Sequence, residues 1–193
     1  MVVAGSLIAG TVLADDPSAM PKPDAQMQEM MKKAEAAGTP GKEHRALDAL
    51  VGEWDAEVKT WMAPDAPPMV TRGSSKATWI MDGRFVQEEF NGQFMGKPFR
   101  GMSLTGYDNL KQKYTTLWID DMSTAMYTSE GDATQGGAVF TFVGTMDCPM
   151  TGQKDMPMKQ VLRIVSAEKH VFEMHDPSKG KDSKTMEITY TRK

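Results

Sequence analysis

The sequence has a single cysteine and no excess of basic residues. Cys148 is the only cysteine in 193 residues, so no disulfide can form within the chain. Lys and Arg number 22 against 26 Asp and Glu, which gives a formal net charge of −4. Proteins that bind nucleic acid need a concentrated positive surface, so the composition excludes nucleic acid as a partner.

The sequence also lacks the motifs of the common catalytic sites. It contains no nucleophile elbow, no His-Glu-x-x-His helix, no phosphate-binding loop and no paired Cys-x-x-Cys. The balance therefore favours a protein that is not an enzyme, and the sequence does not identify a cofactor. The composition is otherwise that of a globular protein large enough to bury one core.

The apolar run at the N-terminus is too short to span a bilayer. Residues 1–14, MVVAGSLIAGTVLA, are uncharged and mostly small or apolar, and the charged residue Asp15 follows. This pattern predicts a signal peptide cleaved after Ala14, with no transmembrane segment left after cleavage. A lone thiol suits a bacterial periplasm, so we expect a secreted or periplasmic protein. No Lys or Arg precedes the run, which leaves an uncleaved apolar tail or a start further upstream as alternatives.

Residues 15–42 form a second region, a linker followed by a helix. Residues 15–23 are rich in Pro, and Asp24 can cap a helix that Gly38 ends. The apolar residues of this helix recur at i, i+3, i+4 and i+7, which predicts one apolar face. They are Met27, Met30, Met31 and Ala34.

Residues 43–193 form the third region, which begins with a short helix ending at Gly52. From residue 53 onward the chain shows about ten short segments of alternating polarity, separated by Gly, Asn, Asp or Pro turns. Such spacing predicts an all-β, antiparallel, up-and-down barrel of about ten strands. A barrel of this size can hold a small ligand, although a fold alone does not name a function.

Several segments of this third region resemble one known family. The matching residues are His44, Leu47, Leu50, Gly52, Trp54, Asp82-Gly83-Arg84-Phe85, Gly101, Gly106-Tyr107-Asp108, Tyr114, Trp118, Asp120 and Glu187-Ile188-Thr189-Tyr190. They resemble the bacterial domain of unknown function 1579, a group of lipocalin-like (calycin-like) β-barrels. The resemblance covers roughly residues 43–193 and implies a fold without an established activity.

The segment Gly52-x-Trp54 is similar to the opening motif of the lipocalins. That resemblance implies that Trp54 plugs the closed end of the barrel. It also implies that a late arginine, here Arg192, packs over the Trp54 indole in a cation–π contact of about 1 kcal/mol. The alternative is an Arg192 side chain in water at a frayed C-terminus.

Aromatic and acidic side chains in the strands are the candidates for a ligand-binding lumen. Adjacent residues of a strand face opposite sides, so Glu88-Glu89 and Asp120-Asp121 can each turn one carboxylate inward. An inward Glu89 or Asp120 would orient a polar ligand or act as a general base; the alternative is a pair in solvent at a strand end. The candidate lumen residues are Trp61, Trp79, Glu89, Trp118, Asp120 and Phe140.

Methionine is unusually abundant, with 18 residues. One explanation is a metal site, because thioether ligands favour Cu(I). A second is an adaptable apolar pocket, which flexible Met side chains suit. The third is replacement of Leu by Met over time, at small cost to packing. His175 is also a candidate axial ligand of haem, because the related nitrobindin barrels hold haem through one histidine. The candidate metal ligands are Cys148, Met150, Met156, Met158 and His175.

Three functions follow from these observations. The sequence favours a secreted or periplasmic carrier that binds a small apolar molecule in the barrel lumen without covalent chemistry. The first alternative is a soft-metal (copper) or haem-binding barrel. The second is a small isomerase-like or cyclase-like enzyme with an inward carboxylate. The sequence specifies neither the ligand nor the oligomeric state.

Overall fold

The computed structural model describes residues 24–63, 66–180 and 183–193. The predicted signal peptide (1–14) and linker (15–23) lie outside these residues. The chain divides into two compact units, Met1–Ala36 and Ala37–Lys193, which are described separately. Among the described residues, no helix is both long and apolar enough to cross a membrane.

Helix α1 (Ala25–Gly38) begins where the sequence predicts. The Asp24 carboxylate accepts a hydrogen bond from the Met27 backbone N–H at 2.8 Å, which satisfies a donor that the first turn leaves free. No residue of α1 is buried, and the apolar face of Met27, Met30 and Met31 is exposed. A helix of 14 residues gains little stability from its own hydrogen bonds.

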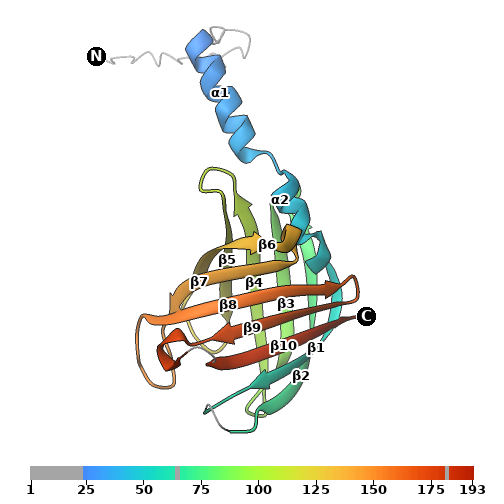
Figure 1. The fold of residues 1–193 in the computed structure, drawn as a ribbon, viewed down its shortest axis with the longest axis vertical. Helices are drawn as coiled ribbons and strands as arrows, with labels where there is room; N and C mark the ends of the chain where they lie inside the picture. The colour runs from blue at the N-terminus through green and yellow to red at the C-terminus, as the bar shows by residue number, and fades with distance from the viewer. Residues whose placement is uncertain (1–23, 64–65, 181–182) are drawn as a thin grey trace, which may run out of the picture. The chain divides into compact units, whose positions relative to one another are not determined.

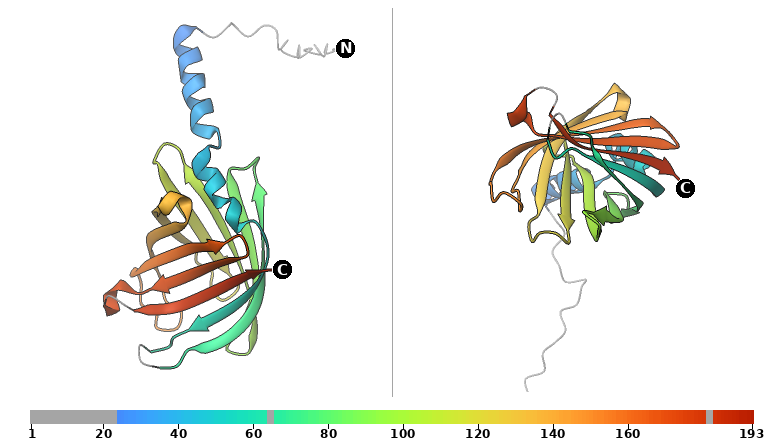
Figure 2. Two further views of the ribbon diagram at one scale, coloured as in Figure 1. Left: turned by 45° about the vertical axis from the view of Figure 1, so that its right-hand side comes forward. Right: turned by 90° about the horizontal axis from the view of Figure 1, so that it is seen from below.

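The second unit is a closed barrel of ten antiparallel strands, and it confirms the predicted fold (Figures 1 and 2). Each strand pairs with the next along the chain, and β10 pairs with β1 to close the sheet. A short helix, α2 (Lys42–Arg45), and a 3-10 turn, η2 (Ala46–Leu50), precede the barrel. The strands are β1 (Gly52–Thr60), β2 (Met69–Ile80), β3 (Phe85–Phe94), β4 (Lys97–Asp108), β5 (Lys113–Asp120), β6 (Tyr127–Thr134), β7 (Val139–Met146), β8 (Met156–Ser166), β9 (Lys169–His175) and β10 (Lys184–Arg192), with 3-10 turns η3 (Gln135–Gly137) and η4 (Pro177–Lys179).

Alternation along the strands separates an inner from an outer face. In β1, Trp54 and Ala56 are buried, whereas Asp55 between them is exposed. The register carries this inner face around the barrel, because Trp54 lies opposite Ser75 of β2 and opposite Arg192 of β10. The same parity therefore identifies the inward residues of every strand.

The buried apolar residues form two clusters inside the barrel. The first contains Leu47, Ala77, Val86, Tyr114, Phe140 and Phe142. The second contains Trp54, Ala56, Phe90, Ile188 and Tyr190. Since Leu47 belongs to η2, the first cluster joins the segment before the barrel to the barrel wall. We call the end at which β1 begins and β10 finishes the closed end, and the opposite end the loop end.

Candidate ligand site in the barrel lumen

Trp54 and Arg192 close one end of the barrel. The Arg192 guanidinium lies 4.1 Å from the centre of the Trp54 ring, and the Trp54 Nε1–H donates to the Leu50 carbonyl at 2.9 Å. Arg192 also donates to the Val51 carbonyl at 3.1 Å and to the Ala167 carbonyl at 2.8 Å. The chain can approach this closely only at a glycine, because a Cβ on Gly52 would stand 2.2 Å from Arg192 Nη1. Gly52, Trp54 and Arg192 thus lie in the arrangement that the lipocalin resemblance implies.

The segment α2–η2 covers the same end. Leu47 is fully buried, and the Tyr114 hydroxyl donates to the Glu43 carbonyl at 3.0 Å. His44 is also buried; its Nδ1 accepts a hydrogen bond from the Gly41 N–H at 3.0 Å, and its ring meets Tyr107 edge-on. These contacts give His44 a structural role in the segment α2–η2 that covers the closed end.

Toward the loop end, the inner face is not completely filled. Several inward side chains in the middle of their strands keep partial accessible surface there, although Phe90, Met158 and Ile188 among them are buried. Side chains in a closely packed interior keep little such surface, so this part of the lining is packed less tightly than a filled core. The partly accessible inward residues include Val58, Glu88, Ser103, Trp118, Phe172, Met174 and Met186.

Glu88 is the charged group of this lining. Val86 and Phe90, two residues before and after it on β3, are buried inside the barrel, so Glu88 shares their face. The Ser103 hydroxyl lies 3.4 Å from Glu88 Oε2, directly opposite on β4. Burial raises the pKa of the Glu88 carboxyl, against the smaller opposing effect of nearby Ser75, Tyr190 and Ser103 hydroxyls.

The groups around Glu88 are only partly satisfied. Ser75 Oγ is buried and has no hydrogen-bond partner, although it is near enough to Glu88 to influence its pKa. Burial, the Glu88 charge and a hydrogen bond with Glu88 all raise the pKa of Tyr190. A partly buried carboxyl beside a hydroxyl that lacks a partner can hold the polar end of a ligand.

His170 joins this polar group to the closed end. Its ring stacks on Tyr190 at 4.3 Å between centroids and meets Trp54 edge-on at 4.4 Å. The ring is buried and its Nδ1 has no hydrogen-bond partner. Burial, with a smaller effect from Arg192, lowers the pKa of His170 to about 4. The neutral imidazole therefore packs as an aromatic ring at neutral pH.

The placement of Glu89 needs a correction. Glu89 is exposed on the outer face of β3, where its carboxylate accepts a hydrogen bond from Gln87 Nε2 at 3.1 Å. The inward member of the acidic pair is Glu88, because the strand parity is set by Val86 and Phe90. The spacing of these apolar residues was the sequence signal that could have identified Glu88.

The structure distributes the other candidate lumen residues over different levels of the barrel. Trp118 faces inward near the loop end and stacks on Phe99, with ring centroids 6.3 Å apart. Asp120 accepts hydrogen bonds from Trp118 Nε1 and from the Met122 and Ser123 backbone N–H groups, so it orders the following turn. This use of its carboxylate leaves Glu88 as the better-placed acid for a lumen ligand.

Three more aromatic candidates fill structural positions. At the closed end, the Trp79 Nε1–H donates a hydrogen bond to the Asp48 carboxylate of η2 at 2.9 Å. Phe140 is fully buried in the first apolar cluster. Trp61 follows β1 at the loop end, where the Lys184 ammonium lies 5.4 Å from the centre of its ring. Of the six predicted lumen residues, Trp118 is therefore the aromatic side chain that stands in the partly accessible part of the lumen.

The predicted soft-metal ligands do not lie together. Met156 and Met158 face inward on β8, but Met150 is 62% exposed in the loop after β7. His175 lies on the face of β9 opposite to His170, with Nε2 3.8 Å from the Glu173 carboxylate. His175 is therefore turned away from the lumen and is not placed to hold a haem inside the barrel. Within the described residues, no group of three or more His, Cys, Asp or Glu side chains could hold a metal ion.

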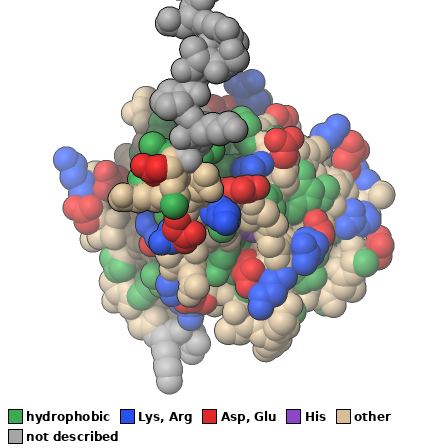
Figure 3. Space-filling view, turned by 90° about the horizontal axis from the view of Figure 1, so that it is seen from above, with side chains coloured by type: hydrophobic (Ala, Val, Ile, Leu, Met, Phe, Trp, Pro, Cys, Tyr) green, Lys and Arg blue, Asp and Glu red, His purple; other side chains and the backbone are tan. Residues whose placement is uncertain are grey.

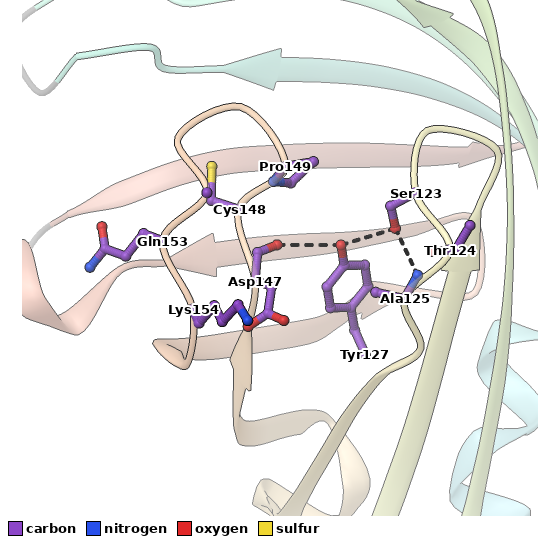
Figure 4. Close-up of a pocket in the computed structure, with 10 residues that line it drawn as sticks. Ser123, Thr124, Ala125, Tyr127, Asp147, Cys148, Pro149, Gln153 and Lys154 are labelled. Atoms are coloured by element: carbon purple, nitrogen blue, oxygen red, sulfur yellow. Dashed lines mark hydrogen bonds between the residues drawn. The ribbon is translucent and has the colours of Figure 1, made fainter.

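Cys148 lines a separate hollow of about 240 Å³ at the loop end (Figure 4). The loops after β5 and β7 form its walls, and the Tyr127 hydroxyl bridges them through Ser123 and the Asp147 carbonyl. Hydrogen bonds from Thr151 are the main cause of a lowered pKa of the Cys148 thiol. A second hollow of about 690 Å³ lies against the outer face of β3–β7, beside Phe85, Leu104 and Leu117.

Acidic and basic side chains alternate over the outer surface. The face in Figure 3 shows Lys and Arg next to Asp and Glu across the barrel. Examples are Lys113 with Asp132 at 2.6 Å and Lys76 with Glu53 at 3.5 Å. Exposed pairs of this kind contribute little to stability. The chemically distinctive groups of the barrel are therefore those on its inner face.

Comparison with known proteins agrees with this description of the barrel. The crystal structure of Rv2717c from M. tuberculosis superposes with a TM-score of 0.56 at 13% sequence identity, covering 80% of this chain and 99% of that one. At that identity the likeness concerns the fold alone. No curated protein matches the chain. A family model described as "protein of unknown function (DUF1579)" matches residues 39–192. The chain therefore belongs to the DUF1579 family.

Proposed function

We propose that the protein carries a small, mainly apolar molecule in its lumen, with the polar end of that molecule at Glu88. The observation that supports this proposal is a partly accessible inner face of aromatic, aliphatic and Met side chains around one inward carboxyl. Sites for small molecules combine a mostly apolar wall with a few polar groups that fix orientation. The lumen of this barrel has that composition.

The chemistry of Glu88 restricts the ligand. Burial disfavours its ionised form, so a partner that donates a hydrogen bond or carries a positive charge gains most from binding beside it. An amine or an alcohol meets this requirement. A carboxylate ligand would place two negative charges at the same buried position. The apolar remainder of the ligand gains about 25 cal/mol for each Å² of apolar surface removed from water, less the cost of ordering.

We further propose that the carrier acts outside the cytoplasm, in the periplasm or beyond. The support comes from the uncharged apolar run 1–14, which ends in a pattern that signal peptidase reads. An exported barrel with one cysteine is stabilised by core burial and by hydrogen bonds of the closed sheet. Such a protein keeps its stability in a compartment that forms disulfides.

A titration with three matched probes tests the proposal. Dodecylamine, dodecanol and dodecanoate share one apolar chain and differ in the polar end. Quenching of Trp fluorescence reports binding, since Trp118 stands in the lumen. We expect saturable binding of dodecylamine and dodecanol, and at least tenfold weaker binding of dodecanoate.

Two neighbouring substitutions give a matched pair for the same titration. Glu88→Gln removes the inward charge, and Glu89→Gln removes a charge from the outer face of the same strand. Dodecylamine should bind at least tenfold more weakly to Glu88→Gln and within twofold of wild type to Glu89→Gln. No saturable binding of any probe, or equal binding by the two variants, would refute the proposal. Melting curves of both variants confirm that they are folded.

A further inference from the structure

Five of the methionines gather on one part of the inner face. Met146 ends β7 directly opposite Met156, the first residue of β8, and Met158 follows two residues later on the same face. Met174 of β9 lies directly opposite Met186 of β10. The five side chains therefore occupy four adjacent strands at the loop end of the barrel.

Their inward direction follows from the strand parity. Met146 shares the face of buried Phe140 and Phe142, and Met186 packs against the second apolar cluster. Met174 lies two residues after inward Phe172. Side chains on the concave face of a closed sheet converge toward the barrel axis, so these thioethers point into one region.

Four of these methionines keep sulfur-bearing side chains that are partly accessible. Met146, Met156, Met174 and Met186 are each only partly buried, whereas Met158 is 3% exposed. Met158 Sδ accepts a weak hydrogen bond from Gln160 Nε2 at 3.6 Å. The four partly accessible methionines are therefore the ones whose sulfur atoms remain available, while Met158 is held in the wall.

From this placement we infer a binding site for a soft monovalent cation, Cu(I) or its analogue Ag(I), made by the thioethers of Met146, Met156, Met174 and Met186. Thioethers are soft, neutral ligands that favour Cu(I) over harder ions. Within each directly opposite pair, Met146 with Met156 and Met174 with Met186, the Cβ atoms stand about 4.5–5.5 Å apart. Met174 lies opposite Gln160 of β8 and not opposite Met156, so the two pairs share an ion through the convergence of their flexible side chains toward the barrel axis. Leucine would line a lumen equally well, but it offers no ligand atom.

This site differs from the one that the sequence suggested. Of the five residues predicted as ligands, only Met156 belongs to the accessible group. The cation site shares Met174 and Met186 with the lining of the proposed ligand site, but it does not use Glu88. The two proposals can therefore fail separately.

Competition with an indicator for Cu(I) tests the site. The parent protein should carry Cys148→Ser, so that the thiol does not bind the metal. Under anaerobic conditions with ascorbate, we expect this parent to withdraw one equivalent of Cu(I) from bicinchoninate. Met156→Leu/Met174→Leu in the same background should bind Cu(I) at least tenfold more weakly.

A matched double variant controls for the loss of methionine in general. Met81→Leu/Met95→Leu removes two thioethers that are 67% and 64% exposed in turns of the outer surface, and should bind within twofold of the parent. Titration of Ag⁺ into parent protein labelled at its Met methyl groups gives a second readout by NMR. The resonances of Met146, Met156, Met174 and Met186 should shift together at one equivalent.

Two results would overturn the inference. One is a parent protein that takes no Cu(I) from the indicator and shows no shifted Met resonance with Ag⁺. The other is equal binding by the inner and outer double variants. Circular dichroism of each variant verifies folding, and the NMR titration needs no substitution in the cluster.

Discussion

At the scale of single residues, burial shifts the pKa of an acid, Glu88, and of a base, His170, inside the barrel. Burial raises the pKa of the Glu88 carboxyl and lowers the pKa of the His170 imidazole. His170 has no partner that would compensate a charge, since its Nδ1 is unpaired and its neighbours Tyr190 and Trp54 are aromatic. Protonation of this ring therefore opposes folding.

The pH dependence of stability should reveal His170. Its pKa falls from 6.5 in the unfolded chain to about 4 in the fold, so the unfolded state binds the proton first as the pH drops. The contribution of neutral His170 to the free energy of unfolding is fully present above pH 6.5. As the pH falls toward 4, the free energy of unfolding decreases by about 3 kcal/mol through this group. Urea unfolding at pH 7 and pH 4 measures the loss. In His170→Phe, the difference between the two pH values should shrink by about that amount.

His175→Gln serves as the control for this comparison, since His175 lies on the outer face of β9. It should keep the pH dependence of the wild-type protein. Glu88 is present in all three proteins, so its opposite contribution cancels when they are compared. Equal pH dependence of wild type and His170→Phe would contradict the role assigned to the buried ring.

At the scale of elements, the closed end depends on contacts between segments that lie far apart in the sequence. Arg192, at the end of β10, bonds to Val51 between η2 and β1 and to Ala167 in the turn between β8 and β9. Its guanidinium also covers the Trp54 ring of β1. One side chain therefore ties three separate stretches of chain together at the seam where the sheet closes.

Removal of this side chain should loosen the seam. Arg192→Ala loses a cation–π contact and two charged hydrogen bonds, and we expect the free energy of unfolding to fall by about 2–4 kcal/mol. Trp54 fluorescence should change in the folded state. Arg163→Ala is the control, because Arg163 is half-exposed on the outer face in an ion pair with Glu173, worth less than about 1 kcal/mol. Similar losses in the two variants would argue against a special role of Arg192.

At the scale of the whole molecule, the closed sheet leaves no strand edge unpaired in the described barrel, because β1 and β10 meet. Exposed edges are the usual route to aggregation through strand pairing, and closure removes them. The second unit also contains all the residues of both apolar clusters. The family match begins at residue 39, close to the division between the two units.

Truncation tests whether the second unit is self-sufficient. A chain of residues 37–193 should fold with a melting temperature within about 3 °C of that of the full chain, which corresponds to less than about 1 kcal/mol. Thermal unfolding followed by circular dichroism measures the difference. As a control, Leu47→Ala in the truncated chain should lower the stability by about 2–5 kcal/mol, because it empties a fully buried site. A large destabilisation on truncation would assign residues 1–36 a part in the fold.

The sequence by itself determined the architecture. The alternation in segments such as residues 53–58 and the frequent turns define antiparallel strands locally, because side chains alternate between faces with a period of two. Gly52, Trp54 and Arg192 could be assigned to the closed end from a family pattern. Asp82-Gly83 is one of the Gly and Asp turns between strands, and the chain from Met81 to Arg84 forms it.

Only the tertiary structure decided which side chains share the lumen. Glu89 and Glu88 differ by one position, and the choice between them depends on the register that buries Val86 and Phe90. A slip of one residue reverses the face of every side chain in a strand. Likewise, Met146 and Met186 lie 40 positions apart and share one wall only because β7 to β10 are consecutive strands of the sheet. Local sequence patterns do not specify these pairings, because the pairings depend on which strands become neighbours in the folded sheet.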